Sequence, residues 1–426
     1  MTKMRRLGIA PVFALGLGVA GSCILPEDPL EAGDGGSATI ADAAVADASG
    51  NGDAGSSEFF YSSCSEAEFP TDLRDSIEAK LADYPFVPGA VVAIYHPSQG
   101  YIVASYGLAH VANKTPMPVD GIFDIGSVHK MFKWIVMEKL FESGDFEYTD
   151  LISTHLASPA IAGATIYDLT AHATGMVDIG NNFIEDILDK NASGGLPHEY
   201  SYEEMMGFLV TDSREGATNG MVNSFAVSNG YNYSSYGPVV AGEIAEALTE
   251  KSSSQLVREL VLDPLGLTSS SIIGVDAFPQ RVQGYGDQAA TDAYGPLPDS
   301  IMASVSSGNE GALFSTACDL LNFSRAISDS EIEFLAPLTI ESRTQEVYDI
   351  PTYLKIGRGM TNYYGWGTGE FWAHAGDGMS SHSSMMGYNP SNGVRAVVLT
   401  NLSPRFIDQE HGIHHDIVAI ANAYYE

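Results

Sequence analysis

The chain has 426 residues, and 45% of them are hydrophobic, so it can bury a full globular core. Its 54 acidic residues against 20 basic residues give a formal net charge of −34, which argues against binding nucleic acid through a broad basic face. The sequence also contains no dinucleotide fingerprint, phosphate-binding loop or Gly-x-Ser-x-Gly elbow. We therefore expect no nucleic-acid partner and no cofactor.

Residues 1–22 have the pattern of a secretory signal peptide. Three basic residues precede an apolar core at 7–20, which is too short to span a bilayer comfortably. The sequence then runs Val-Ala-Gly-Ser-Cys and resembles a bacterial lipobox, in which Cys23 is lipidated and becomes the mature N-terminus. An ordinary signal peptide with an incidental cysteine is the alternative. We expect secretion across the inner membrane to the cell envelope, as a lipoprotein that contacts the membrane only through this lipid anchor.

Residues 23–58 have the composition of an acidic flexible linker. They are rich in Ala, Gly, Asp and Ser, and such a segment cannot bury enough apolar surface to become ordered. An Asp-rich calcium loop is the functional alternative, but the spacing fits no EF-hand, so we expect no metal site. Without Cys23 the mature chain has only Cys64 and Cys318, which leaves one disulfide possible but not assigned.

Residues 65–426 are expected to form the folded domain, with strands near both of its ends. A helix after Pro70 and a hairpin precede the middle of the chain, and three strands and a closing helix follow it. Strands at both ends with helices between them predict an α+β fold, in which one antiparallel sheet is flanked by helices and carries an inserted helical lobe at about 145–335. The strands are expected at 90–95, 101–106, 371–374, 383–388 and 394–400, and the helices at 73–81, 202–210, 239–248, 256–262, 319–327 and 413–425.

A Ser-x-x-Lys pattern stands at the head of an apolar helical segment that follows the hairpin. In a helix, residues three apart lie on one face, so Ser127 and Lys130 are expected side by side on the first turn. A serine hydroxyl needs a base to become a nucleophile, and a buried lysine can be that base because desolvation disfavours the ammonium. The helix N-terminus also offers free N–H groups to a developing oxyanion. A helix cap followed by a surface lysine is the alternative.

Three further segments carry residues suited to chemistry. Residues 231–237 place Tyr233 before a helical pattern, residues 372–378 place His374 on an expected strand, and residues 169–175 read Leu-Thr-Ala-His-Ala-Thr-Gly. Each has a structural alternative, because Tyr233 can be a packing residue and His374 a core histidine. We expect His172 to structure a loop rather than to take part in the reaction.

Together these segments resemble the serine β-lactamase-related family, which contains class C β-lactamases, penicillin-binding DD-peptidases and related esterases and D-aminopeptidases. The resemblance covers roughly residues 70–425 and depends on the order and spacing of the motifs. They are Pro-Gly-Ala at 88–90, Lys-Thr-Pro-Met at 114–117, Gly-Ser-x-x-Lys at 126–130, the block at 169–175, Pro-Leu-Gly-Leu at 264–267 and Gly-Ala-Leu-Phe-Ser-Thr at 311–316.

The resemblance implies a role for each matching residue. It implies that Ser127 is the acylated nucleophile, Lys130 its base and Tyr233 the group that passes the proton to the leaving group. His374, Ala375 and Gly376 match the family's third motif, which is Lys-Thr-Gly in β-lactamases and His-x-Gly in several peptidases and esterases. The oxyanion hole would be the backbone N–H groups of Ser127 and Asp377.

Departures from the family pattern bear on the substrate. Ser235 stands where the family has an asparagine that holds the amide of β-lactam or peptide substrates. Ala375 replaces a threonine, and Asp377 places a carboxylate where it would repel a substrate carboxylate by about 1 kcal/mol or more at short range. We therefore expect poor β-lactamase and DD-carboxypeptidase activity, and better activity on esters or on peptides with a free amine.

The sequence thus predicts an extracytoplasmic serine hydrolase that acts on a small-molecule or peptide acyl substrate through an acyl–Ser127 intermediate. Peptidoglycan peptide or β-lactam hydrolysis is the second interpretation. A binding or sensor domain that keeps the fold without catalysis is the third, and the departures at Ser235 and Asp377 favour it while the intact Ser127, Lys130 and Tyr233 oppose it.

Overall fold

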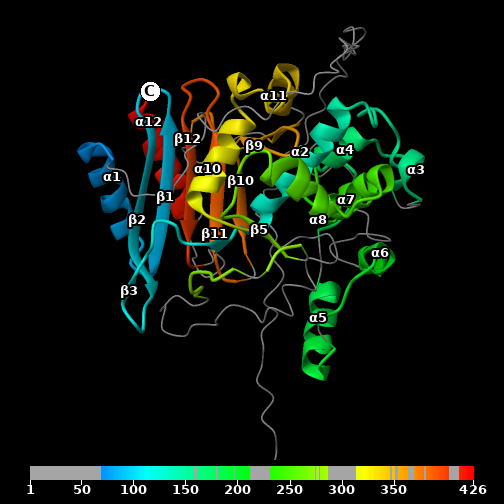
Figure 1. The fold of residues 1–426 in the computed structure, drawn as a ribbon, viewed down its shortest axis with the longest axis horizontal. Helices are drawn as coiled ribbons and strands as arrows, with labels where there is room; N and C mark the ends of the chain where they lie inside the picture. Colours follow the sequence, from blue (N-terminus) through cyan, green and yellow to red (C-terminus); the bar gives the residue numbers. More distant parts are fainter. Residues whose placement is uncertain are drawn as a thin grey trace, which may run out of the picture.

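The computed structural model describes residues 69–157, 161–178, 181–195, 197–211, 231–273, 275–277, 279–285, 313–345, 348–350, 354–362, 369–378, 380–402 and 412–426. Within these ranges a large antiparallel sheet lies beside a group of helices (Figure 1). The predicted α+β fold is therefore confirmed. The segments at 1–22 and 23–58 lie outside the described residues, so the signal peptide, Cys23 and the linker stay predictions.

The described part of the main sheet contains nine strands in the order β3-β2-β1-β12-β11-β10-β9-β8-β7. Its centre joins the two chain ends, because β1 pairs with β12 from Ala90 opposite Thr400 to Tyr95 opposite Arg395. The sequence predicted the antiparallel sheet and its strands β1, β2, β10, β11 and β12, but not the short strands β3, β7, β8 and β9. The strands are β1 (Gly89–His96), β2 (Gly100–His110), β3 (Thr115–Pro116), β7 (Tyr348–Ile350), β8 (Leu354–Ile356), β9 (Thr361–Asn362), β10 (Trp372–Asp377), β11 (Ser383–Tyr388) and β12 (Arg395–Thr400).

Helices cover both faces of this sheet. The side chains of β1 alternate, so Val92 and Ile94 join the core beneath α1 (Thr71–Ala82) and α12 (Ile413–Tyr424), while Val91 and Ala93 join the larger core on the other face. Figure 1 shows α1 and α12 next to each other at the sheet. The Tyr84 hydroxyl beyond α1 donates to Asp416 of α12 at 2.6 Å, which links the two chain ends directly.

The helix α2 (His129–Glu142) runs through the larger core and follows a 3-10 turn, η1 (Gly126–Val128). Most of its residues are buried, including the charged residues Lys130, Lys133 and Glu138. A helix that is covered on nearly all sides belongs to the interior of a large domain. The Ser-x-x-Lys segment is therefore part of the core, and its structural alternative, a surface lysine after a cap, is wrong.

A helical lobe lies on the other side of α2. Its helices are α3 (Ile152–His155), α4 (Ile166–Thr170), α5 (Asn181–Ser193), α6 (Tyr202–Thr211), α7 (Tyr236–Thr249) and α8 (Ser253–Val257), followed by η5 (Arg258–Leu262). A second sheet has three strands in the order β4 (Phe123–Asp124), β6 (Leu313–Ser315) and β5 (Ser271–Ile272). The helix α10 (Ala317–Ala326) falls within the range predicted for the lobe but packs on the main sheet, where Ser324 Oγ donates to the Gly387 carbonyl at 3.1 Å.

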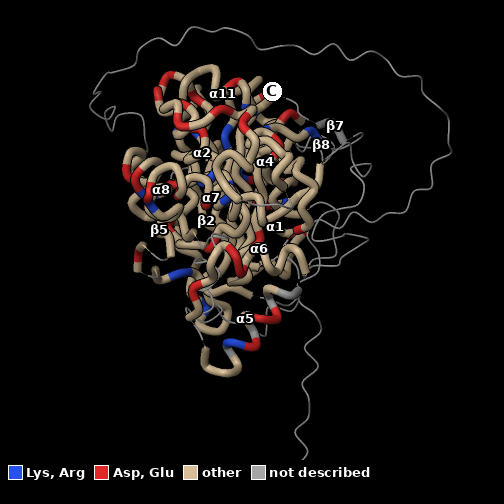
Figure 2. Tube along the Cα trace, turned by 90° about the vertical axis from the view of Figure 1, so that its right-hand side faces the viewer, with Lys and Arg blue, Asp and Glu red and all other residues tan. Residues whose placement is uncertain are grey.

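Acidic positions outnumber basic positions along the trace in Figure 2, in keeping with the net charge of −34. Among the described residues, no helix has the length and apolar character needed to cross a membrane. Cys318 forms a disulfide, and the other two cysteines of the sequence, Cys23 and Cys64, both lie outside the described residues.

Candidate active site

The structure places Ser127 and Lys130 side by side, as the sequence predicted. Ser127 lies in η1, and Lys130 lies in the first turn of α2 with none of its surface exposed. The Lys130 Nζ donates to the Ser127 Oγ at 3.0 Å. This is the contact that a lysine needs to take the serine proton directly.

Two glycines allow the turn that carries Ser127 to touch strand β10, which lies between β11 and β9 in the main sheet. Gly126 has φ +50°, and a methyl group added there would lie 2.4 Å from the Asp377 carbonyl carbon and 2.6 Å from the Asp377 nitrogen. A methyl group on Gly376 would lie 2.2 Å from the Ile125 oxygen and 2.8 Å from the Ser127 nitrogen. The backbone of Ser127 and the backbone of Asp377, which the sequence predicted to form the oxyanion hole, therefore meet at one junction.

A buried carboxylate, Asp124 at the end of β4, holds the two sides of this junction together. It accepts hydrogen bonds from the Gly126 N–H at 3.1 Å and from the Ser380 N–H at 3.0 Å. Burial raises the pKa of Asp124, while these two N–H groups lower it. Sequence reasoning assigned Asp124 no role, since an acidic residue before Gly-Ser is not informative without the fold.

A buried histidine supports Asp124 from behind. His382 Nδ1 accepts from the Asp124 N–H at 2.9 Å, and its Nε2 lies 3.0 Å from the Val282 carbonyl. Because the backbone N–H is a donor, Nδ1 carries no proton and Nε2–H donates to that carbonyl. Burial lowers the pKa of His382 to about 3, so this arrangement is neutral at physiological pH. On the strand side, Ser384 Oγ donates to the Ile125 carbonyl at 2.7 Å.

Tyr233 lies on the lobe side of Lys130. The centroid of its ring is 5.6 Å from the Lys130 Nζ, 4.7 Å from the His172 ring and 6.2 Å from the His374 ring. The structure therefore brings Ser127, Lys130, Tyr233 and His374 into one neighbourhood from three separate parts of the chain.

His172 shapes the loop that carries Tyr233, as the sequence predicted. It has φ +53°, its carbonyl accepts from the Asn232 N–H at 2.8 Å, and its Nδ1 accepts from the Ser234 N–H at 3.3 Å. Burial lowers the pKa of His172 to about 3, with the nearby His374 and Lys130 adding to the effect. A permanently neutral ring is suited to hold backbone groups and to pack against the tilted ring of Tyr233.

His374 of β10 is neutral at pH 7 as well. Burial lowers its pKa to about 4, and the charge of Lys130 adds to this lowering. Its Nδ1–H donates to the Ala375 carbonyl at 2.7 Å, which leaves Nε2 as an acceptor. The third motif of this chain therefore lacks the permanent cation that a lysine at position 374 would supply.

Ser235 is buried at the start of α7, and its N–H donates to the Asp178 carboxylate at 2.7 Å. Sequence reasoning did not single out Asp178, although it follows the block at 169–175 by three residues. The loop that carries Tyr233 thus rests on a carboxylate from the lobe as well as on His172.

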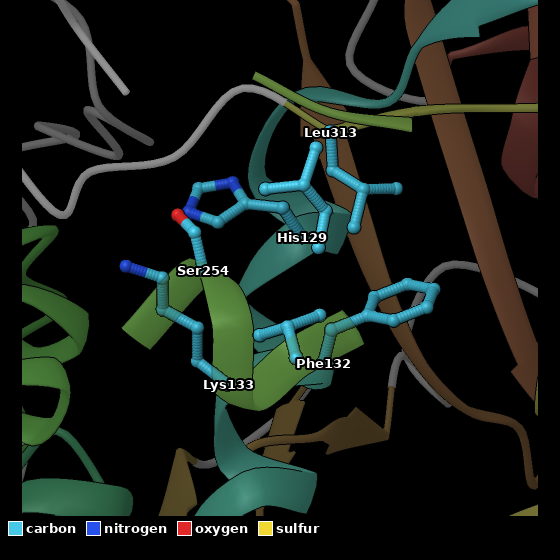
Figure 3. Close-up of a pocket in the computed structure, with 7 residues that line it drawn as sticks. His129, Phe132, Lys133, Ser254 and Leu313 are labelled. Atoms are coloured by element: carbon cyan, nitrogen blue, oxygen red, sulfur yellow. The ribbon is translucent and has the colours of Figure 1, made fainter. Parts of the chain in front are cut away.

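A pocket lies beside α2, on the side of His129 and Lys133 (Figure 3). It is lined by His129, Phe132, Lys133, Ser254, Val257, Ile272 and Leu313. His129 Nδ1–H donates to the Gly126 carbonyl at 2.7 Å, so this histidine supports the turn of Ser127 from the rear. Burial and the neighbouring Lys130 and Lys133 keep the pKa of His129 well below its usual value.

Comparison with known proteins gives one family match, to the model described as Beta-lactamase, over residues 75–419. Penicillin-binding protein 4 of Amycolatopsis lactamdurans is 24% identical over 328 residues, covering 74% of this chain and 81% of that protein. Penicillin-binding protein 4* of Bacillus subtilis (strain 168) is 22% identical over 299 residues, and the match spans 66% of this chain and 61% of that protein's length.

Solved structures give the same fold. D-amino acid amidase from Ochrobactrum anthropi SV3, complexed with L-phenylalanine amide, superimposes with a TM-score of 0.66 at 22% identity, over 83% of this chain and 98% of that chain. A D-stereospecific amidohydrolase from Streptomyces sp. superimposes with a TM-score of 0.63 at 19% identity, over the same 83% of this chain and 98% of its own.

Proposed function

Since this chain belongs to the beta-lactamase family, we propose that it is an extracytoplasmic serine hydrolase that cleaves an ester or amide through an acyl–Ser127 intermediate. The contact of 3.0 Å between the Lys130 Nζ and the Ser127 Oγ carries the proposal. The family supports a serine hydrolase in general, and the buried contact supports Ser127 as the reacting serine and Lys130 as its base. A sensor domain without catalysis would not need to keep a lysine fully buried against this hydroxyl.

The proposed reaction has two halves. Lys130 takes the proton of Ser127 while the oxygen attacks the acyl carbon, and the N–H groups of Ser127 and Asp377 stabilise the resulting oxyanion. The intermediate collapses as the bond to the leaving group breaks, and the proton reaches that group through Tyr233. A water molecule then attacks the acyl–enzyme, and its proton returns along the same groups as Ser127 is released.

For the substrate, we propose an acyl compound with a free amine and without a carboxylate next to the scissile bond. His374 is neutral at pH 7, and Asp377 contributes a negative charge at the end of β10, so a carboxylate finds no permanent cation in the third motif. The similarity to an amidase in complex with an amino-acid amide supports this choice. The penicillin-binding relatives support the second candidate, cleavage of peptidoglycan peptides or β-lactams.

We also propose that the protein is exported and tethered through Cys23. The disulfide at Cys318 supports an oxidising compartment, because disulfides persist outside the cytoplasm. The signal-like residues 1–22 and the acidic segment at 23–58 fit an anchored domain at the end of a flexible tether.

A panel of four substrates tests the proposal. D-phenylalanine amide, its N-acetylated form, a p-nitrophenyl acyl ester and nitrocefin are compared by kcat/KM, with Ser127→Ala as the blank. The proposal predicts turnover of the ester and of the free-amine amide, with the N-acetylated amide and nitrocefin slower. Fast nitrocefin turnover would instead establish a β-lactamase, and a panel with no Ser127-dependent turnover would favour the sensor.

A further inference from the structure

Arg343, the last residue of α11 (Pro337–Arg343), is a buried cation whose side chain makes no hydrogen bond in the described part of the structure, although the charge of Glu138 attracts it. Its side chain has no exposed surface, and Nε, Nη1 and Nη2 all lack a hydrogen-bond partner there. Buried ions in proteins are normally paired, because an isolated charge loses its hydration without compensation. An orphaned guanidinium in the core therefore indicates that a group is missing from its surroundings.

A second guanidinium lies next to it. The Arg358 N–H donates to the Arg343 carbonyl at 3.1 Å, and a methyl group on the neighbouring Gly357 would lie 2.3 Å from the same oxygen. Arg358 is only 6% exposed, and its guanidinium packs over the ring of Tyr148 at 4.3 Å. The fold thus brings two buried arginines together instead of separating them.

One carboxylate serves both arginines. Glu138 of α2 is 3% exposed, and its Oε1 lies 3.6 Å from the Arg358 Nη2, so it pairs with Arg358. With Glu138 ionised, the three groups carry a net charge of +1 without access to solvent. The buried hydroxyl of Tyr388 has no hydrogen-bond partner among the described residues, so it is available as an additional donor, whereas the Tyr148 hydroxyl interacts with Glu138.

We propose that a single small monovalent anion, chloride under physiological conditions, binds between Arg343, Arg358 and the hydroxyl of Tyr388. A water molecule can accept a hydrogen bond from Arg343 but cannot offset its charge, and because Arg343 has no exposed surface and Arg358 only 6%, a small ion fits the place better than a phosphate or a substrate carboxylate. The proposal concerns a structural ligand of the core and does not depend on the proposed function.

The anion would stabilise the packing behind the candidate active site. Glu138 lies on α2 eight residues after Lys130, and the Gly359 N–H, beside Arg358, donates to the Thr170 carbonyl at 2.9 Å. Gly359 also packs on Trp134, whose ring meets the His172 ring edge-on at 6.1 Å. The anion would therefore hold α2, α11 and the turn between β8 and β9 together beneath the loop of Tyr233.

The test measures the unfolding temperature of the full chain at constant ionic strength while chloride replaces gluconate. The proposal predicts that the unfolding temperature rises saturably with chloride, by about 2 °C when chloride is at ten times its Kd. Bromide should act like chloride, and sulfate should have no such effect. Glu138→Gln removes the competing carboxylate and should lower the Kd for chloride about tenfold. Arg343→Met should abolish the response, whereas Lys251→Met, at an exposed ion pair, should retain it.

A crystal of the unmutated protein grown in bromide keeps the test independent of variants that fail to fold. The proposal predicts an anomalous peak within hydrogen-bond distance of the Arg343 guanidinium. Ordered waters in its place, or an unfolding temperature indifferent to halide, would overturn it. A peak that appears only at molar bromide, with no saturable thermal response, would identify an adventitious ion only and would overturn it equally.

Discussion

Gly376→Ala should separate the two halves of the proposed oxyanion hole. The added methyl group would lie 2.2 Å from the Ile125 oxygen, against the 3.0 Å below which real Cβ contacts essentially never fall. The strand β10 must therefore move away from η1 by about 0.8 Å, and the methyl group also points at the Ser127 nitrogen from 2.8 Å. A shift of this size at an oxyanion hole typically lowers the rate by about 10²–10³-fold. Overpacking should also cost about 1–3 kcal/mol of stability.

The assay is the rate of labelling by a fluorophosphonate, followed by intact mass at a temperature where circular dichroism shows the variant to be folded. Gly207→Ala is the matched control, because nothing lies within 4 Å of a methyl group there and an alanine in the middle of α6 favours the helix. We expect the control to label at the original rate and Gly376→Ala at least 100-fold more slowly. Equal rates for a folded Gly376→Ala variant would refute the idea that β10 and η1 share one reacting centre.

Three further predictions follow from the same geometry. Asp377→Asn should lower the ratio of kcat/KM for free-amine amides to kcat/KM for N-acetylated amides by about tenfold, because a charge interaction of about 1–2 kcal/mol is lost. An unchanged ratio would show that Asp377 does not select the substrate. Ser384→Ala removes the hydrogen bond of 2.7 Å to the Ile125 carbonyl. The free energy of unfolding, measured in urea, should therefore fall by about 1 kcal/mol, and fluorophosphonate should label Ser127 more slowly. A loss of stability with an unchanged labelling rate would show that Ser384 does not position the turn of Ser127. Burial lowers the pKa values of His374 and His414 to about 4. Between pH 6.5 and pH 4 the unfolded state therefore binds more protons than the folded state, so the free energy of unfolding must fall as the pH drops through this window. At pH 5 the loss is about 2 kcal/mol for each histidine. Burial raises the pKa of Asp319 to about 6 and also raises the pKa values of Asp124, Glu138 and Glu243, and these carboxyl groups act in the opposite direction. Burial also lowers the pKa values of His172 and His382 to about 3, which adds to the loss of stability, so a thermal midpoint that stays flat or rises from pH 7 to pH 5 would contradict this assignment.

The fold was predictable because its sheet depends on patterns within short segments. The continuous apolar run at 90–95, the turn after Pro97 and the valine-rich segment at 394–400 each indicate a strand or its end without reference to the rest of the chain. The C-terminal boundary of the lobe was harder to predict. The helix α10 has the same amphipathic pattern as the lobe helices, and only its tertiary packing shows that it lies on the main sheet.

The sequence predicted contacts in the candidate site only where the spacing of two residues along one helix determines the distance between their side chains. Ser127 and Lys130 are three residues apart on one helical turn, so their contact follows from the geometry of a helix. Asp124 is different, because its partner Ser380 lies 256 residues later and no local pattern links them. Asp178 was missed for the same reason, since its contact with the Ser235 N–H joins two loops that are remote in the sequence. Arg343 and Arg358 are also brought together by the fold, and nothing in their sequence neighbourhoods indicates that both are buried.

The most direct measurement of the central claim is the intact mass of the full chain after incubation with a fluorophosphonate, followed by peptide mapping. The proposed mechanism predicts one stoichiometric adduct on Ser127, abolished in Ser127→Ala and strongly slowed in Lys130→Met. An unmodified chain, or an adduct that persists in Ser127→Ala, would contradict it.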